Sequence, residues 1–119
     1  MTETTETMNL NPESLTNEQG MTCLRNYIRM FDCLPLETLR KMSESSYSEA
    51  VSLWKNSPDD KESLMVNWLR QTAIGHQVER RYDQRHGYSG RTFTDDELRD
   101  RVKHARICSH SRPITCDFQ

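Results

Sequence analysis

Apolar residues recur at helical spacing in several stretches of the chain. They lie three or four positions apart over residues 16–34, and the same spacing returns at 35–42, 46–55 and 94–109. No stretch shows the strict alternation of apolar and polar residues that is typical of a half-buried strand. Together with one longer segment, described below, the pattern predicts an all-α protein, a small bundle of about five helices.

Capping boxes mark three of the helix starts. In this motif a Ser or Thr at the N-cap and a Glu or Gln three residues later bind each other's backbone amides. The run "SESS" at 43–46 separates two of the apolar segments, so we expect two short helices with a break between them. The three pairs are Thr16 with Gln19, Ser46 with Glu49, and Thr94 with Glu97.

The longest predicted helix covers about 58–86. Its start signal is "SPDD", with Ser57 as N-cap and Pro58 in the first turn. At about 1.5 Å per residue this helix would be about 43 Å long, so we expect it to bend or to project from the bundle. Gly75 lies on its apolar side, and a helical glycine costs about 1 kcal/mol relative to alanine. We expect another helix to cross closely at Gly75, because its bulky neighbours would otherwise leave a gap.

The distribution of polar residues predicts one folded domain. Residues 1–13 are acidic and polar and are expected to form a disordered arm, whereas 14–119 form a single helical domain in which 87–93 link to the C-terminal helix and tail. Apolar residues make up only 34% of the chain, so the core should be thin. We expect the first four helices to supply most of it, and the last helix to dock weakly or against a partner.

Charge is unevenly distributed along the chain, although the formal net charge is only -2. Residues 1–69 carry 6 basic and 11 acidic side chains, whereas 70–119 carry 10 basic and 7 acidic. This asymmetry could steer a partner or order self-association, but the basic excess is too small to require nucleic acid.

The sequence predicts a cytoplasmic protein. No apolar run approaches the roughly 18 residues that would span a bilayer. The opening residues are acidic, with no basic residue before Arg25, unlike a secretory signal. The four cysteines are therefore expected to be free thiols or ligands rather than disulfides. They are Cys23, Cys33, Cys108 and Cys116.

One face of the long helix is rich in Arg and Gln. At 100° per residue, these side chains cluster within about a third of a turn, while Trp68 and Tyr82 lie on another side. Such a face is either simply solvated or a docking surface for an acidic protein surface or a phosphate backbone. The residues expected to bind a partner are Trp68, Arg70, Gln77, Arg81, Tyr82, Arg85 and Arg91.

Catalytic motifs are missing from the sequence. No serine stands in a Gly-x-Ser-x-Gly elbow, and no glycine-rich loop resembles a phosphate cradle. The acidic run 95–97 is explained by its place in the first turn of a helix, opposite the helix dipole. The two short helices lack the basic side chains of a DNA-reading pair. We therefore expect a protein that is not an enzyme and uses no cofactor.

The stretch "HARICSHSRPITC" at 104–116 concentrates potential metal ligands. His104 and Cys108 would share one helix face, and zinc favours thiolate and imidazole donors. The spacing lacks the paired doublets of zinc motifs, so we expect no metal here, with a zinc site or a Cys108–Cys116 disulfide as alternatives. A zinc site would draw on His104, Cys108, His110 and Cys116.

These observations favour a protein that works by binding. The leading hypothesis is a small regulatory or adaptor protein, an inhibitor being one form of it, that binds another protein through the long helix and the basic C-terminal region. Self-association through apolar helix faces is expected as well. The alternatives are a zinc-stabilised module and a nucleic-acid-binding regulator. The latter would use Arg70, Arg80, Arg81, Arg85 and Arg91.

Overall fold

The structure is a computed structural model that describes residues 15–85 and 93–110. Four helices occupy these residues, and none of the described residues lies in a strand, so the all-α prediction is confirmed. None of the helices in these two ranges is long and apolar enough to cross a membrane. The predicted arm and almost all of the predicted linker lie outside the described residues. The helices are α2 (Asn17–Met30), α3 (Leu36–Asn56), α4 (Lys61–Arg85) and α5 (Asp95–Ser109).

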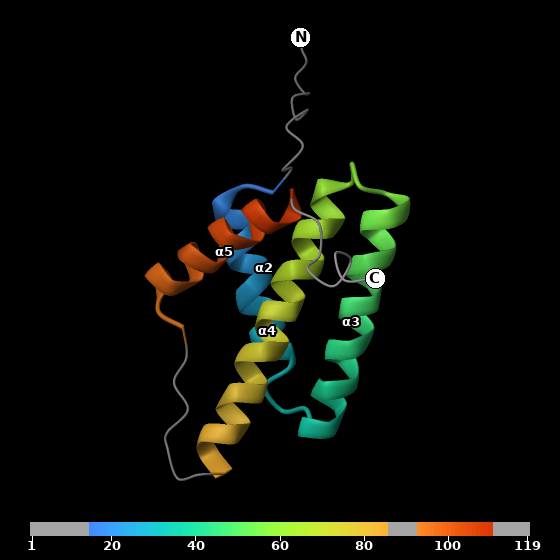
Figure 1. The fold of residues 1–119 in the computed structure, drawn as a ribbon. Helices are drawn as coiled ribbons and strands as arrows, with labels where there is room; N and C mark the ends of the chain where they lie inside the picture. The colour runs from blue at the N-terminus through green and yellow to red at the C-terminus, as the bar shows by residue number, and fades with distance from the viewer. Residues whose placement is uncertain (1–14, 86–92, 111–119) are drawn as a thin grey trace.

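Helix α4 lies at the centre of the molecule. Helix α3 runs antiparallel along one side of it, and α2 and α5 pack on the other side, where α5 crosses both α2 and α4 (Figure 1). Because α4 contacts all three other helices, most of its circumference is covered by protein. This arrangement explains why few of its residues are available as a solvent-facing surface.

The predicted break at 43–46 is wrong, because α3 is one continuous helix. Ser46 is buried in its middle, only 4% exposed, and its carbonyl accepts a hydrogen bond from Nδ2 of Asn67 at 3.0 Å. A buried partner on α4 therefore satisfies the polar groups that led us to expect a helix start. The two predicted short helices become one, and the described residues contain four helices rather than five.

The start of α4 also differs from the prediction. Residues 57–60 form a turn, in which the amide of Asp60 donates to the carbonyl of Ser57 at 3.0 Å. Pro58 occupies the second position of this turn, where its fixed φ is favourable. Asp60 supplies the capping side chain instead, since its Oδ1 accepts from the amide of Ser63 at 3.1 Å. The helix then continues without a break through Gly75 to Arg85.

The capping boxes of α2 and α5 are confirmed. The Oγ1 atoms of Thr16 and Thr94 accept from the amides three residues later, at 3.1 and 3.2 Å. The side chains of Gln19 and Glu97 accept in return from the N-cap amides, both at 2.9 Å. These starts were predictable because every partner lies within the same helical turn.

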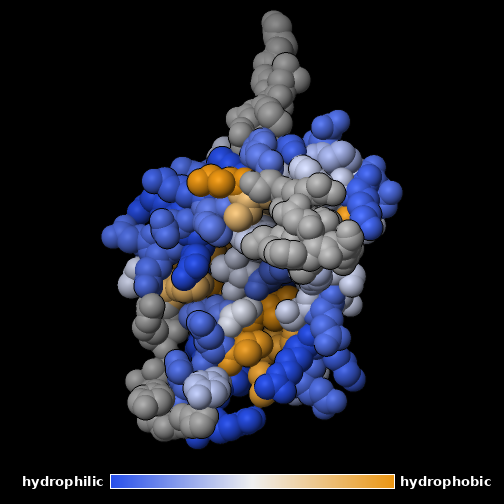
Figure 2. Space-filling view, in the orientation of Figure 1, coloured by the Kyte–Doolittle hydropathy of each residue, from blue (hydrophilic) through white to orange (hydrophobic). Residues whose placement is uncertain are grey.

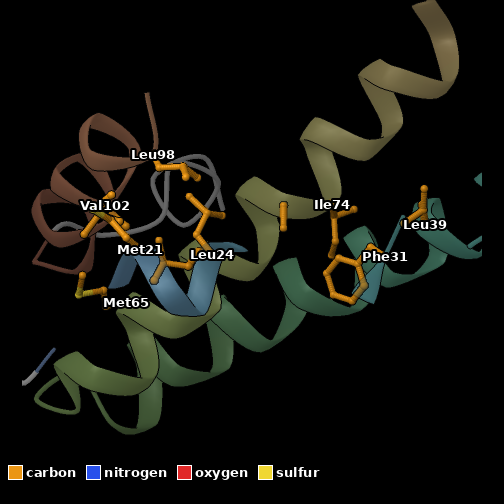
Figure 3. Packing of buried hydrophobic residues seen from close by; sticks show 11 residues of the cluster. Met21, Leu24, Phe31, Leu39, Met65, Ile74, Leu98 and Val102 are labelled. Atoms are coloured by element: carbon orange, nitrogen blue, oxygen red, sulfur yellow. The ribbon is translucent and has the colours of Figure 1, made fainter. Parts of the chain in front are cut away.

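The core is a single cluster to which all four helices contribute (Figure 3). Contrary to the expected weak docking, α5 places Leu98, Val102 and Ala105 in this cluster, each no more than 4% exposed. Helices α2 and α5 approach each other closely at Gly20 of α2. A Cβ at this position would lie only 2.7 Å from Cγ1 of Val102, so the glycine lets α2 and α5 pack against each other.

Arginine side chains connect the helices around this core. Arg25 of α2 pairs with Asp95 at 2.9 Å, and Arg106 of α5 donates to the carbonyl of Leu15 at 3.1 Å. On the face shown in Figure 2, most of the described surface is hydrophilic, and apolar side chains gather mainly along the seam between α3 and α4.

Candidate functional site

A groove of about 340 Å³ lies between α4 and α5. Helix α4 supplies its floor and one wall, and α5 together with the residue before its N-cap supplies the other. The lining combines two aromatic rings with polar and charged side chains. The lining residues are Trp68, Gln71, Thr72, Gly75, His76, Glu79, Phe93, Arg101 and His104.

Gly75 is part of the groove lining. It is exposed, and among the described residues a Cβ at this position would meet no atom within 4 Å apart from its chain neighbours and its own helix backbone. The prediction of a close helix crossing at Gly75 is therefore wrong; the close crossing occurs at Gly20. Gly75 has no packing contact that would explain the absence of a side chain.

Aromatic rings form the walls of the groove. The ring of Phe93 stacks on that of His76 with their centroids 4.1 Å apart, and the guanidinium of Arg101 lies 5.4 Å from the centroid of Phe93. At the other end, the rings of Trp68 and His104 are 6.0 Å apart. Trp68 and Phe93 are half-buried, so each also presents part of its ring to the groove.

The rim of the groove carries charges of both signs. Glu79 on α4 and Arg101 on α5 are exposed and line opposite sides of the opening. Thr72 lies deeper, and its hydroxyl donates to the carbonyl of Trp68 at 2.9 Å, which leaves the hydroxyl oxygen available as an acceptor. The groove can therefore hold an apolar or aromatic group and bind polar atoms at its edges.

Phe93 also lines a second hollow, of about 420 Å³, between α2, α4 and α5. Its basic side chains include Arg25 and Arg80. Arg25 pairs with Asp95 at 2.9 Å and Arg80 pairs with Asp32 at 2.6 Å. Because acids of this chain already engage these two cations, the hollow is a weaker candidate for a ligand site than the α4–α5 groove.

The predicted Arg/Gln face of α4 points largely into the protein. Gln77 is fully buried, and its Nε2 donates to the carbonyl of Ile28 at 2.7 Å. Its Oε1 accepts from Nη1 of both Arg80 and Arg81 at 3.3 Å. Arg81 in turn donates to the carbonyl of Leu34 at 3.0 Å. The expected docking surface is thus, in its central part, an internal contact between α4 and the end of α2.

The other predicted partner-binding residues are dispersed. Arg70 pairs with Glu49 of α3 at 2.9 Å and lies over the ring of Tyr27. Tyr82 is 61% exposed in the last turns of α4, and Arg85, the last residue of that helix, is also exposed. Arg91 lies outside the described residues. Of the six predicted residues that the structure describes, only Trp68 lines the α4–α5 groove.

The predicted metal-ligand candidates are only partly brought together. Nε2 of His104 and Sγ of Cys108 lie 3.5 Å apart on α5. His110 follows the end of that helix and is exposed, and Cys116 lies outside the described residues. Within 15–85 and 93–110, no group of three or more His, Cys, Asp or Glu side chains could hold a metal ion.

Two thiols are shielded from solvent enough to affect their ionisation. Burial raises the pKa of Cys108, and burial also raises the pKa of Cys23 despite the opposing charge of Arg70. Both thiols are therefore predominantly protonated near neutral pH, which disfavours nucleophilic chemistry at these positions.

Most of the groove could not be predicted from the sequence. No pattern marks Gln71, Thr72, His76 or Glu79 as site residues, because polar residues on a helix are normally solvated. Gly75 was an available signal, since a glycine in the middle of a helix requires an explanation. Comparison of the chain with protein-family models, curated proteins and solved structures finds no match.

Proposed function

We propose that this protein is a small non-enzymatic binding protein that holds a side chain of a partner protein in the α4–α5 groove, as an adaptor or an inhibitor does. Gly75 is the observation that carries the proposal. A helical glycine costs about 1 kcal/mol relative to alanine, and in 15–85 and 93–110 no atom outside its helix lies within 4 Å of where a Cβ would be. What the glycine provides is room above the groove floor.

The groove walls support a protein partner. Trp and Arg are enriched among the residues that dominate binding energy at protein interfaces, and buried aromatic anchors are the usual contacts. Trp68, Phe93 and Arg101 bring these side-chain types to one groove. Its volume of about 340 Å³ is at the small end of ligand sites, suited to one aromatic or long aliphatic side chain.

The pairing of the arginines favours a protein partner over nucleic acid. Binding to a phosphate backbone needs basic side chains that are free to neutralise phosphates. Arg70 pairs with Glu49, Arg80 pairs with Asp32, and Arg81 donates to backbone carbonyls. A nucleic-acid regulator would have to break these contacts, whereas a partner side chain can enter the groove without disturbing them.

Filling the groove tests the proposal. Gly75→Leu places a side chain in open space, so the variant should fold with a melting temperature no lower than that of the wild type. Glu62→Leu, an exposed position on the same helix outside the groove, is the matched control. With nuclease-treated lysate of the native host, wild type and Glu62→Leu should retain a common protein partner that Gly75→Leu loses.

Two results would contradict the proposal. One is a set of bound proteins that is identical for the three baits. The other is a partner that nuclease treatment removes from all of them. A partner identified in this way can be checked with purified components in a Trp54→Phe background, where Trp68 is the sole tryptophan. Its fluorescence should change on binding, because Trp68 forms part of the groove wall.

A further inference from the structure

Helix α5 carries an imidazole and a thiol at metal-chelating distance. His104 and Cys108 are one helical turn apart, and Nε2 and Sγ lie 3.5 Å from each other. His104 is exposed and Cys108 is half-buried, whereas Val102 and Ala105 of the same helix are fully buried in the core. The pair therefore lies on the flank of α5, beside the α4–α5 groove that His104 also lines.

The spacing of the two donor atoms matches an edge of a zinc coordination tetrahedron. With Zn–S of about 2.3 Å, Zn–N of about 2.0 to 2.1 Å and a tetrahedral angle, the sulfur and nitrogen should be about 3.6 Å apart. The observed 3.5 Å agrees with this value, so one ion can bind both atoms without rearrangement of the helix. The pair supplies half of the four protein ligands that a structural zinc site normally has.

We propose that His104 and Cys108 form a zinc half-site that a second copy of this chain completes, giving a two-fold symmetric dimer bridged by a His₂Cys₂ ion. Two-fold association is the commonest way in which identical chains pair, and it presents the same patch on both subunits. In such a dimer, each copy contributes His104 and Cys108, so the ion has four protein ligands and needs no other residue. Within the described ranges no third ligand of the same chain completes the site.

The surface beside the pair suits such a contact. Ile107, the residue before Cys108 on α5, is 65% exposed and is one of the most exposed large apolar side chains of the described residues. In a symmetric dimer it would be covered by the second copy. Zinc binding releases the proton of each Cys108 thiol to solvent, and the two thiolates then balance the charge of the ion, so the coordination unit brings no net charge into the interface.

This inference does not rest on the proposed function. His104 lines the α4–α5 groove, but Cys108 does not, so Cys108→Ser tests the zinc site without altering the groove. A groove that binds no partner would not contradict zinc-bridged pairing, and a protein that binds no zinc would not contradict the groove proposal.

The test is zinc titration of the purified full-length chain under reducing conditions, followed by sedimentation analysis and metal quantification. We expect a shift from monomer to dimer with about one zinc ion per two chains, reversed by a chelator. Replacing zinc with Co²⁺ should give the thiolate charge-transfer and strong visible absorption of a tetrahedral thiolate site. His104→Ala and Cys108→Ser should each weaken the zinc-dependent dimer at least about tenfold.

Control variants at the other candidate ligands make the test specific. Cys33→Ser, His110→Ala and Cys116→Ser should leave both the stoichiometry and the dimer unchanged. One zinc ion per monomer that requires Cys116 would overturn the two-chain site in favour of a site within one chain. Absence of zinc-dependent dimerisation, or a dimer that persists in Cys108→Ser, would overturn it as well.

Discussion

Arg81 on α4 donates from Nη2 to the carbonyl oxygen of Leu34, 47 residues earlier in the chain, at 3.0 Å. The same guanidinium contacts the carbonyls of Phe31 and Asp32, where α2 ends. Backbone carbonyls of an irregular turn have no regular ladder to pair them and must be satisfied from elsewhere. One side chain of α4 therefore binds the carbonyls of the turn after α2 and fixes the turn that leads into α3.

Arg81→Ala should destabilise the fold. Removing the guanidinium leaves carbonyls of the turn after α2 without their charged donor, a loss of about 2 kcal/mol in the free energy of unfolding. Urea denaturation measures it. Arg81→Lys should recover only part of the loss, because an ammonium lacks the planar fork that spans several acceptors.

Arg85→Ala, one turn later and exposed, should change stability by no more than about 0.5 kcal/mol. A similar loss in both alanine variants would contradict the role of Arg81 in this turn.

The contact between α3 and α4 contains a buried polar network. Asn67, 1% exposed, donates to the carbonyl of Ser46 at 3.0 Å, and its Oδ1 accepts from Nε2 of Gln71 at 2.7 Å. Buried polar groups that lose their partners retain the full cost of desolvation.

Asn67→Ala should therefore lower the free energy of unfolding by about 2 kcal/mol, since it leaves the amide of Gln71 without this acceptor. Thermal and urea denaturation should agree on the loss. Asn26→Ala is the matched control at an exposed helical position, and its stability should be unchanged or slightly raised. Equal stability of the two variants would show that the network contributes nothing.

Local signals in the sequence predicted the helices well where all partners lie within one turn. The capping boxes at Thr16 and Thr94 needed no knowledge of the rest of the chain. Ser46 shows the limit of such signals: it begins no helix, because its partner Asn67 is 21 positions away on another helix. Polar groups that tertiary contacts satisfy cannot be distinguished from capping residues by spacing alone.

The candidate site was harder to predict for a related reason. Helical spacing groups the Arg and Gln residues of α4 on one face, but spacing does not show whether that face meets water or another helix. Gln77, fully buried, is the clearest example. The groove joins residues of α4 to Phe93 and Arg101, and only the packing of α5 brings these together.

The thiols should react at very different rates. Cys33 is exposed in the turn after α2, while burial raises the pKa of Cys23 and Cys108 and so reduces their thiolate fraction. In a Cys116→Ser background at pH 8 without metal, iodoacetamide should modify Cys33 at least about tenfold faster. Mass spectrometry of timed samples gives the three rates.

The pH dependence of the same thiols has a definite sign. Because the folded protein holds its protons on Cys23 and Cys108 above their ordinary value of 9.0, the unfolded chain ionises first. The stability that these two groups contribute is complete below that value and is lost as the pH rises through the higher folded pKa. Cys108→Ser should therefore show a shallower loss of stability between neutral and strongly alkaline pH than the wild type. An unchanged slope would contradict the burial of this thiol.

Gly75 and Gly20 should respond in opposite directions to the same substitution. Gly75→Ala adds a methyl group in open space and improves helix propensity, so the free energy of unfolding should rise by about 1 kcal/mol. Gly20→Ala gains the same propensity but forces a Cβ to within 2.7 Å of Val102, a stiff, fully buried side chain. Overpacking of a core typically costs about 1 to 3 kcal/mol, which should outweigh the gain. Because both substitutions replace a helical glycine with alanine, urea denaturation of the pair isolates packing from propensity. Stabilisation of both variants would show that α2 and α5 do not meet closely at Gly20, and destabilisation of both would show that the space above Gly75 is not open.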